Sequence, residues 1–586
     1  MGGHRTHRGR RADGVADLSA RAGVAAALAV AVAAPFLLTG LGAAPFDDPG
    51  EGMHAEIARE LTVSGDVLRL TLNGVRYVDK PPLLYTLMAG VFAALGPSEG
   101  TARLVPAVAA LAAVGATAWL GARLLGAASG LVAGLALATC TGFFAYGRYV
   151  RPETLFVAAL AGGFALALTG LVEGRRRRVV GGLAVFGLAA LAKDPLGALA
   201  PPLAIGAALA LGGRARPVSR WLPWPGATAA LGLGFGWYAL VELTTPGFLW
   251  YTVVDNHVLN VARARHFPDE DVPLTALQFL AVASMAAVPW VAPAAAATWR
   301  LVRARAWRDP REMPWIALAL WAVGVLGITA LSPFRLPHYG LPAYPALALL
   351  AARGWHELGA ARLAAVHAVV FAALAAACGA AWASDGAVFM TDVMGATDVA
   401  TRTGAAAGAE APLPPWPALR ALLGTAALVF GAGAVATAAA ARRCAGRAVW
   451  GVLATLLALM PVVTQGLGLV ASHRSVRDLA REVAARGGGQ DLVAHEGPIE
   501  SSAALEWYGT ARPVIVDGRR SVLGFGATRA DGAGAFWDVE RLRQAWLGER
   551  RVWLVSVRPP ADSVAAGLPG ATLVRQSGGR RLYVNR

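Results

Sequence analysis

The chain has 586 residues, of which 56% are hydrophobic and 15% are charged, and its formal net charge is +16. A soluble protein of this length carries far more charge, so the composition indicates a polytopic membrane protein. The basic excess does not indicate nucleic-acid binding, because the basic residues gather in the connections between apolar runs.

Residues 1–22 are basic and precede an apolar run at 23–43. This run is long enough to span a bilayer and lacks a clear small-residue cleavage site. It is therefore interpreted as a first membrane helix with a cytoplasmic N-terminus, not as a signal peptide. Further runs bring the total to about thirteen predicted spans within residues 23–472. They lie near residues 102–122, 127–146, 152–172, 179–193, 198–213, 221–241, 273–299, 313–331, 339–352, 361–383, 416–440 and 448–471.

The connections between these runs predict the orientation. Arginine-rich connections fall on one side when every span is counted, at 175–178, 214–220, 300–311 and 442–447. By the positive-inside rule, this side is cytoplasmic. The extracytoplasmic side then receives the first loop at 44–101, the loop at 242–272 and everything after residue 472.

The first outer loop begins with a predicted amphipathic helix. Asp48 and Glu51 fit a D-x-x-E capping box, apolar residues recur every four positions from Met53, and Gly65 supplies the stop. Because the opposite face is acidic, we expect this helix to lie on a surface.

Later in the same loop, Lys80 precedes two prolines and an apolar run, with Tyr77 and Tyr85 beside it. This position places the ammonium group near the depth of the lipid headgroups. Two interpretations stay open from the residues alone. Lys80 is either a phosphate receptor or a snorkelling lysine that anchors the chain where it enters the membrane.

The tail, residues 473–586, changes in composition and predicts a small extracytoplasmic α/β domain. Apolar runs typical of strands occur at 491–494, 513–516, 551–557 and 571–574. They alternate with helical patterns at 475–486, 499–508 and 538–548. Glycine-rich turns separate several of these segments.

Several segments in the membrane part resemble one family. They are EGMHAEIARE at 51–60, NGVRYVDKPPLLY at 73–85, GRYVRPE at 147–153, LAKDP at 191–195 and LSPFRLPHYGLPAYP at 331–345. Their order and spacing are similar to the family that holds lipid A aminoarabinose transferases and protein O-mannosyltransferases. The resemblance implies an integral-membrane glycosyltransferase of the GT-C fold that uses polyprenyl-phosphate sugars.

The resemblance also implies catalytic carboxylates. The family has an Asp-Glu pair on the first loop, and the matching pair in this chain is Gly50-Glu51. Asp47, Asp48 or Glu51 would then supply the charge, unless Asp48 and Glu51 only cap a helix. Glu153 matches a second family acid, and its alternative role is to pair with the positive end of a helix dipole.

Four cations are expected to bind the donor phosphate: Lys80, Arg263, Arg265 and Arg335. The expected substrate pocket comprises His54, Tyr77, Asp79, Tyr85, His257, His338 and Tyr339. Without the family match, the residues around 335–339 would be interpreted as snorkelling and aromatic-belt residues. Metal ligation is unknown, because no His/Cys/Asp cluster has ligand spacing, although loop carboxylates offer ligands for a divalent cation.

The expected function is transfer of a sugar from a polyprenyl-phosphate donor to a lipid, glycan or protein acceptor. The reaction would occur on the outer side of a bacterial plasma membrane, as in lipid A modification or protein O-mannosylation, without nucleic acid. The alternative is a transporter or flippase of a lipid-linked substrate, which predicts inverted repeats and charges within the spans. A noncatalytic scaffold for the tail domain leaves the acidic loop unexplained.

Overall fold

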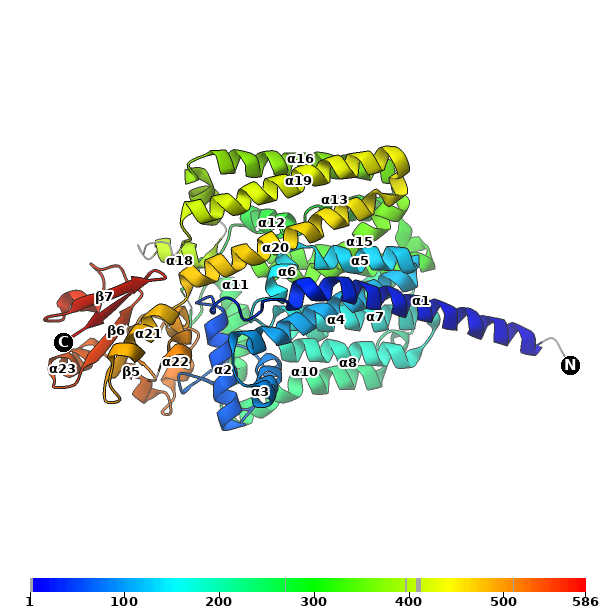
Figure 1. Ribbon diagram of the computed structural model, residues 1–586. Coiled ribbons are helices and arrows are strands. Elements are labelled where there is room, and N and C mark those ends of the chain that lie inside the picture. The colour runs from blue at the N-terminus through cyan, green and yellow to red at the C-terminus, as the bar shows by residue number, and fades with distance from the viewer. Residues whose placement is uncertain (1–3, 269, 396–397, 407–412, 510) are drawn as a thin grey trace.

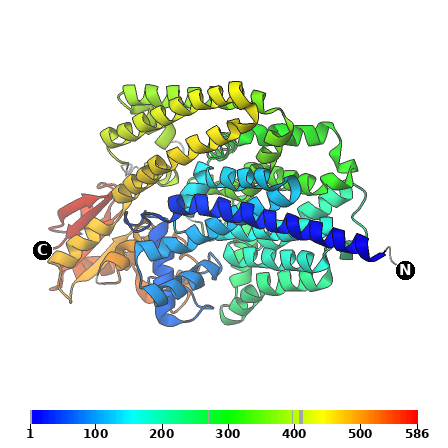
Figure 2. The same cartoon turned by 45° about the vertical axis from the view of Figure 1, so that its right-hand side comes forward.

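The computed structural model describes residues 4–268, 270–395, 398–406, 413–509 and 511–586. A bundle of helices forms the larger part, and a sheet-containing domain packs on one of its ends (Figure 1). The N-terminus lies at the other end, and the turned view in Figure 2 shows the same separation. The two ends of the bundle therefore differ in what covers them.

The predicted apolar runs lie on helices of this bundle. In chain order the helices are α1 (His4–Leu38), α3 (Leu83–Leu95), α4 (Glu99–Leu125), α5 (Ala127–Ala138), α6 (Thr141–Gly147), α7 (Glu153–Glu173), α8 (Arg176–Ala192), α9 (Leu196–Leu211), α10 (Trp224–Thr244), α12 (Ala276–Met285), α13 (Val291–Arg303), α14 (Met313–Leu331), α15 (Tyr344–Glu357), α16 (Ala360–Ala383), α19 (Trp416–Cys444) and α20 (Ala448–Arg474). The run at 273–299 was expected to be one span but forms two helices, α12 and α13.

Among the described residues, six stretches are long and apolar enough to cross a membrane, or seven if the bent pair α5 and α6 counts as one span. One of the six, Trp416–Arg474, comprises both α19 and α20. The predicted total of about thirteen spans is not confirmed. Helices such as α9 and α12 are too short to span a bilayer alone, because a span needs about 20 residues.

Small residues bring the helices of the bundle close together. A Cβ atom added to Gly130 of α5 would lie 2.4 Å from the backbone nitrogen of Ala122 in α4. In the same way, a Cβ on Gly182 of α8 would lie 2.7 Å from the nitrogen of Ala167 in α7. Close backbone approach at small residues is typical of helices packed in membranes. These contacts fix α4 and α7, both of which contribute to the site described below.

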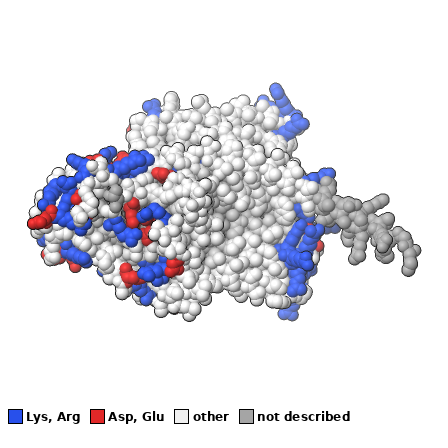
Figure 3. All heavy atoms as spheres, turned by 60° about the horizontal axis from the view of Figure 1, so that its bottom comes forward, with Lys and Arg blue, Asp and Glu red and all other residues white. Residues whose placement is uncertain are grey.

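Charged side chains gather at the two ends of the molecule and leave a broad uncharged band between them (Figure 3). Lys and Arg dominate the end near the N-terminus, whereas the sheet-containing end carries both signs. The uncharged band is the surface expected where hydrocarbon replaces water as the solvent.

The C-terminal domain contains a six-stranded sheet with the order β5-β4-β3-β6-β8-β7. Its strands are β3 (Leu492–Glu496), β4 (Val514–Val516), β5 (Phe536–Trp537), β6 (Val552–Ser556), β7 (Thr572–Ser577) and β8 (Arg580–Val584). The first four are parallel to one another, and β8 pairs antiparallel with both β6 and β7. The helices are α21 (Arg477–Arg486), α22 (Ala504–Tyr508) and α23 (Val539–Leu547). The strand-like runs expected in the tail lie on β3, β4, β6 and β7.

Helix α2 (Glu51–Ser64) stands between the bundle and the C-terminal domain (Figure 1). The expectation that it lies on a surface is wrong, because both of its faces are covered and even Glu56 is buried. A short hairpin of β1 (Thr71–Leu72) and β2 (Val75–Arg76) follows it. Helix α2 and the hairpin are therefore an internal layer that carries residues to the junction of the two parts.

Candidate active site

A cavity of about 1540 Å³ lies between the helical bundle and the C-terminal domain. One part of its wall is apolar and is formed by α9 and α14, including Leu203, Ala204, Val325 and Ile328. The other part is polar and is formed by the first outer loop, the start of α7 and the C-terminal domain. A molecule with a long apolar chain and a charged head matches this division.

Asp48 lines the polar part but does not cap α2. The residue before the helix is Gly50, and it makes no side-chain capping bond. The Asp48 carboxylate instead accepts hydrogen bonds from the backbone N–H groups of Val476 (3.2 Å) and Ala504 (3.4 Å). The predicted capping box is therefore wrong, because the Asp48 carboxylate accepts hydrogen bonds from the C-terminal domain and not from the first turn of α2.

Burial raises the pKa of Asp48 to about 7, although the nearby Arg580 opposes the rise. A carboxyl whose pKa is higher in the folded state stabilises the protein below pH ~4, and this stabilisation is lost as the pH rises toward 7. Because Asn does not titrate, we expect Asp48→Asn to gain melting temperature relative to the wild type between pH 5 and pH 8. Thermal unfolding in detergent at both pH values measures this gain, and an equal difference at both pH values would contradict it.

Glu51 forms a buried ion pair with Arg103 of α4. The guanidinium donates to both carboxylate oxygens, at 2.7 and 2.5 Å, and the backbone N–H groups of Asp47 and Val150 donate to the same carboxylate at 3.0 Å. Arg103 also donates to three backbone carbonyls of the 41–45 segment. With all of these donors in place, Glu51 holds the first loop on α4 and has little capacity left to accept a proton from a substrate.

Asp47 is another first-loop acid in the cavity wall. Its Oδ2 accepts from the Tyr149 hydroxyl at 3.1 Å and lies 3.7 Å from Arg474. Its buried Oδ1 has no hydrogen-bond partner among the described residues. Burial raises the pKa of Asp47 to about 6, and Arg474 opposes the rise. A carboxylate with this pKa is suited to general-base chemistry near neutral pH.

Tyr149 also accounts for the glycine at position 50. A Cβ atom on Gly50 would lie 2.2 Å from the Tyr149 hydroxyl oxygen. No side chain fits there unless Tyr149 moves, and Tyr149 is the group that orients Asp47. The glycine, the tyrosine and the aspartate therefore form one arrangement.

Two cations and an imidazole surround Glu153 at the start of α7. Its carboxylate lies 3.2 Å from Lys193, 3.3 Å from His338 and 3.6 Å from Arg151. These three residues line the cavity, whereas Glu153 lies behind them. Lys80 lies on the same wall and pairs with Asp79. The cations therefore face the cavity, and the carboxylate of Glu153 behind them offsets part of their positive charge.

The chain contains two lysines, Lys80 and Lys193, among 53 basic Lys and Arg residues. Both line the cavity. Lys193 lies 3.2 Å from Glu153, and Lys80 pairs with Asp79. An anion that reached both ammonium groups would be attracted by both charges.

The expected pocket residues form two hydrogen-bonded groups. The His54 Nδ1 atom lies 2.9 Å from the Tyr85 hydroxyl, which in turn donates to the Tyr77 hydroxyl at 3.3 Å. Burial lowers the pKa of His54 to about 3, so this imidazole is neutral. On the 250–267 loop, the hydrogen bond to Asp194 raises the pKa of His257. The first group shapes the wall, and the second can carry a positive charge.

The structure brings most of the predicted residues to one cavity. The predicted residues in its wall are Asp47, Asp48, Glu51, His54, Tyr77, Asp79, Lys80, His257, Arg265, His338 and Tyr339. Tyr85, Glu153, Arg263 and Arg335 do not line it. Arg263 is exposed, and Arg335 donates to backbone carbonyls of Leu274, Ala330 and Ser332. The structure therefore does not place these two arginines in the cavity wall, and their assignment to a phosphate site stays a prediction.

The predicted phosphate-binding cations do not include other cations of the cavity wall, among them Arg151, Lys193, Arg474 and Arg558. Lys193 had a visible signal, because it belongs to one of the resembling motifs. Arg558 follows a strand of the tail domain, and nothing in its local sequence places it near the first loop.

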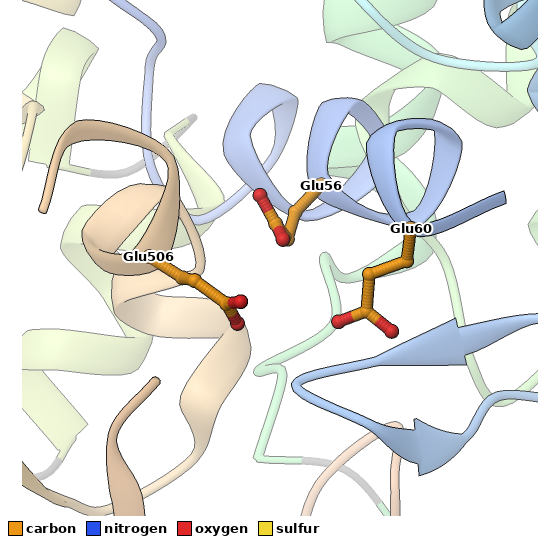
Figure 4. A group of neighbouring side chains, drawn as sticks. All are labelled: Glu56, Glu60 and Glu506. Atoms are coloured by element: carbon orange, nitrogen blue, oxygen red, sulfur yellow. The ribbon is translucent and has the colours of Figure 1, made fainter. Parts of the chain in front are cut away.

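Three glutamates lie close enough together to share a cation: Glu56 and Glu60 on α2, and Glu506 on α22 (Figure 4). However, Arg59 lies 2.5 Å from Glu56 and 3.0 Å from Glu506. Arg512 lies 3.1 Å from Glu506 and 3.4 Å from Glu60. Each of the three carboxylates is already paired with at least one of the two guanidinium groups, so this cluster ties the C-terminal domain to α2 and does not fit a metal centre.

Comparison with known proteins agrees with this geometry. Residues 79–260 match the model of the dolichyl-phosphate-mannose-protein mannosyltransferase family. A search of curated protein sequences gives no match. The structure of ArnT from Cupriavidus metallidurans bound to undecaprenyl phosphate superposes with a TM-score of 0.78 at 21% identity and covers 96% of this chain and 98% of that one. The apo structure of ArnT gives a TM-score of 0.79 at 22% identity, with coverage of 96% and 97%. The family model supports the resemblance between residues 79 and 260, and the chain is a multi-pass membrane protein with the GT-C fold of ArnT.

Proposed function

We propose that this protein is a glycosyltransferase that moves a sugar from a polyprenyl phosphate to a hydroxyl group of a cell-envelope acceptor. The observation that carries the proposal is the cavity. Its wall combines apolar residues of α9 and α14 with a cluster of cations and the carboxylate of Asp47. The mannosyltransferase family match and the undecaprenyl phosphate bound to ArnT support a lipid-phosphate donor.

The polyprenyl chain of the donor would lie along the apolar wall, where Leu203 and Ile328 are largely exposed. Its phosphate would meet Lys80, Lys193 and Arg151. An ammonium group is a compact point charge that suits a single phosphate oxygen, whereas a guanidinium suits two oxygens at once. Glu153 would keep the cations in place when no donor is bound.

Transfer then proceeds as a displacement at the anomeric carbon. The acceptor oxygen forms a bond to this carbon while the bond from the carbon to the phosphate oxygen breaks. The electron pair leaves with the polyprenyl phosphate, whose negative charge the cations stabilise. The acceptor proton passes to Asp47, whose Oδ1 has no hydrogen-bond partner among the described residues and whose pKa is about 6.

Orientation follows from the distribution of charge. The end rich in Lys and Arg lies opposite the C-terminal domain (Figure 3). The positive-inside rule supports a cytoplasmic location for that end. The cavity and the C-terminal domain would then face the outside of the plasma membrane, where a lipid, glycan or protein acceptor is available.

The presence of two lysines allows a direct test of donor binding. Reductive methylation with ¹³C-formaldehyde labels Lys80, Lys193 and the N-terminal amine and keeps their charge. We expect undecaprenyl phosphate to shift both lysine signals in ¹³C NMR spectra, whereas undecaprenol, which lacks the phosphate, should not. Lys80→Arg and Lys193→Arg variants assign the signals. If the lipid phosphate leaves both lysine signals unchanged, the proposed donor site is wrong.

A matched pair of variants tests the affinity. Lys80→Met should weaken undecaprenyl phosphate binding by roughly tenfold or more, because it removes a charged hydrogen-bond donor. Arg335→Met removes a cation outside the cavity and should leave the affinity within about twofold. Native mass spectrometry of the detergent-solubilised protein measures both affinities.

A further inference from the structure

The strand order of the C-terminal sheet defines a crevice. From β3 the chain moves outward to β4 and β5, and then returns to place β6 on the opposite side of β3. All four strands are parallel, so their carboxyl ends share one edge of the sheet. In open parallel sheets, ligands bind at the carboxyl edge where the strand order reverses. In this domain the reversal lies between β3 and β6.

The cavity reaches this edge of the sheet. Pro498 and Glu500 follow the end of β3, and Val557 and Arg558 follow the end of β6, and all four line the cavity. Gly578, in the turn between β7 and β8, adjoins them in the same wall. The domain therefore supplies a binding edge to the cavity and does more than cover it.

The crevice presents hydrogen-bonding groups of both signs. Arg558 is a half-buried cation whose guanidinium lies 3.0 Å from Glu270 of the 263–275 loop and 3.5 Å from Asp517 after β4. Glu270 and Glu500 line the cavity beside it. Carboxylates accept hydrogen bonds from hydroxyl groups, and a guanidinium donates to their oxygens. Such a set suits a hydroxyl-rich ligand better than a simple anion, because Arg558 is already charge-balanced.

The crevice adjoins the proposed base. Arg580 at the start of β8 donates to the backbone carbonyl of Arg474. Arg474 lies 3.7 Å from Asp47, and Asp48 accepts from the backbone of Ala504 in the C-terminal domain. A ligand held at the carboxyl edge of the sheet would therefore extend toward Asp47.

We propose that this crevice is the acceptor subsite and that it binds the hydroxyl-rich glycan part of the acceptor through Arg558, Glu270 and Glu500. The inference rests on the proposed glycosyltransferase function and names its acceptor class. A peptide acceptor fits the site less well, because peptides commonly pair with a free sheet edge. The edge strands of this sheet are β5 and β7, and their residues do not line the cavity.

The test compares two arginines that link the C-terminal domain to the remainder of the chain. Arg558→Met changes the crevice, whereas Arg512→Met breaks a similar ion pair with Glu506 and Glu60 outside the cavity. Each variant is produced in a strain that lacks the chromosomal gene. Sugar transfer is measured by mass spectrometry of glycolipids, lipid-free glycans and proteins, and binding of undecaprenyl phosphate to the purified protein is measured separately.

We expect Arg558→Met to lower transfer by roughly tenfold or more with binding of undecaprenyl phosphate within about twofold of the wild type, and Arg512→Met to retain both. If Arg558→Met does not fold, the same two measurements are made on Glu500→Gln, which should also lower transfer. Unchanged transfer in the folded crevice variant, or sugar found on proteins, would overturn the inference. Glycolipid and lipid-free glycan products both support it and identify the source of the glycan. A wild-type protein that neither binds undecaprenyl phosphate nor transfers sugar would instead refute the proposed function.

Discussion

Asp47→Asn is expected to lower sugar transfer by about 10²-fold or more, because it removes the proposed proton acceptor. The variant should fold as well as the wild type, since Asn keeps an oxygen that can accept from Tyr149. Transfer in a strain that lacks the chromosomal gene, and thermal unfolding of the purified variant, measure the two effects. Asp398→Asn removes another cavity-wall carboxylate that pairs with Arg474, at 2.5 Å, and should lower transfer less than Asp47→Asn does.

The pH dependence provides a second arm of this test. The hydrogen bond from Tyr149 lowers the pKa of Asp47, against the larger effect of burial. In Tyr149→Phe the pKa should therefore rise, and the acidic limb of the rate profile should move to higher pH. Wild-type rates in Asp47→Asn would show that another group accepts the proton.

Glu51→Gln is expected to cost about 3–5 kcal/mol in the free energy of unfolding, because it leaves the charge of Arg103 buried without its partner. Both side chains are nearly inaccessible, with exposed fractions of 2% and 6%. A lower melting temperature in detergent, together with a poorer yield of folded protein, is the measurable result.

The double variant Glu51→Gln/Arg103→Gln removes both charges and should recover part of the lost stability. Any protein that folds should retain transfer, since Glu51 is not the proposed base. A Glu51→Gln protein that melts like the wild type but transfers no sugar would reverse the roles of Glu51 and Asp47.

The sequence predicted the membrane helices and much of the cavity wall because these features have local signals. Apolar runs report burial in hydrocarbon, and the Lys80 segment is recognisable from its prolines and tyrosines. Long-range partners have no such signal. The D-x-x-E pattern at Asp48 is typical of a helix cap, but the carboxylate binds backbone more than 400 residues away in the chain, at Val476 and Ala504.

The arginines illustrate the same limit. Arg335 lies in a resembling motif, yet its guanidinium is used by nearby carbonyl groups. Arg558 lies in the tail, outside any motif, yet it lines the cavity. Motif membership indicates that a position lies near the site, whereas the direction of a side chain depends on tertiary contacts that periodicity and spacing do not encode.

We propose that a polyprenyl-phosphate sugar is consumed at the Asp47 cavity. The most direct measurement is mass spectrometry of envelope lipids and glycans from a strain that lacks the gene and is complemented with the wild type or with Asp47→Asn. We expect the deletion strain and the Asp47→Asn strain to lack one sugar modification and to accumulate one polyprenyl-phosphate sugar. The wild-type gene should restore the modification and remove the accumulated donor. An envelope that is identical in all of these strains would contradict the proposal.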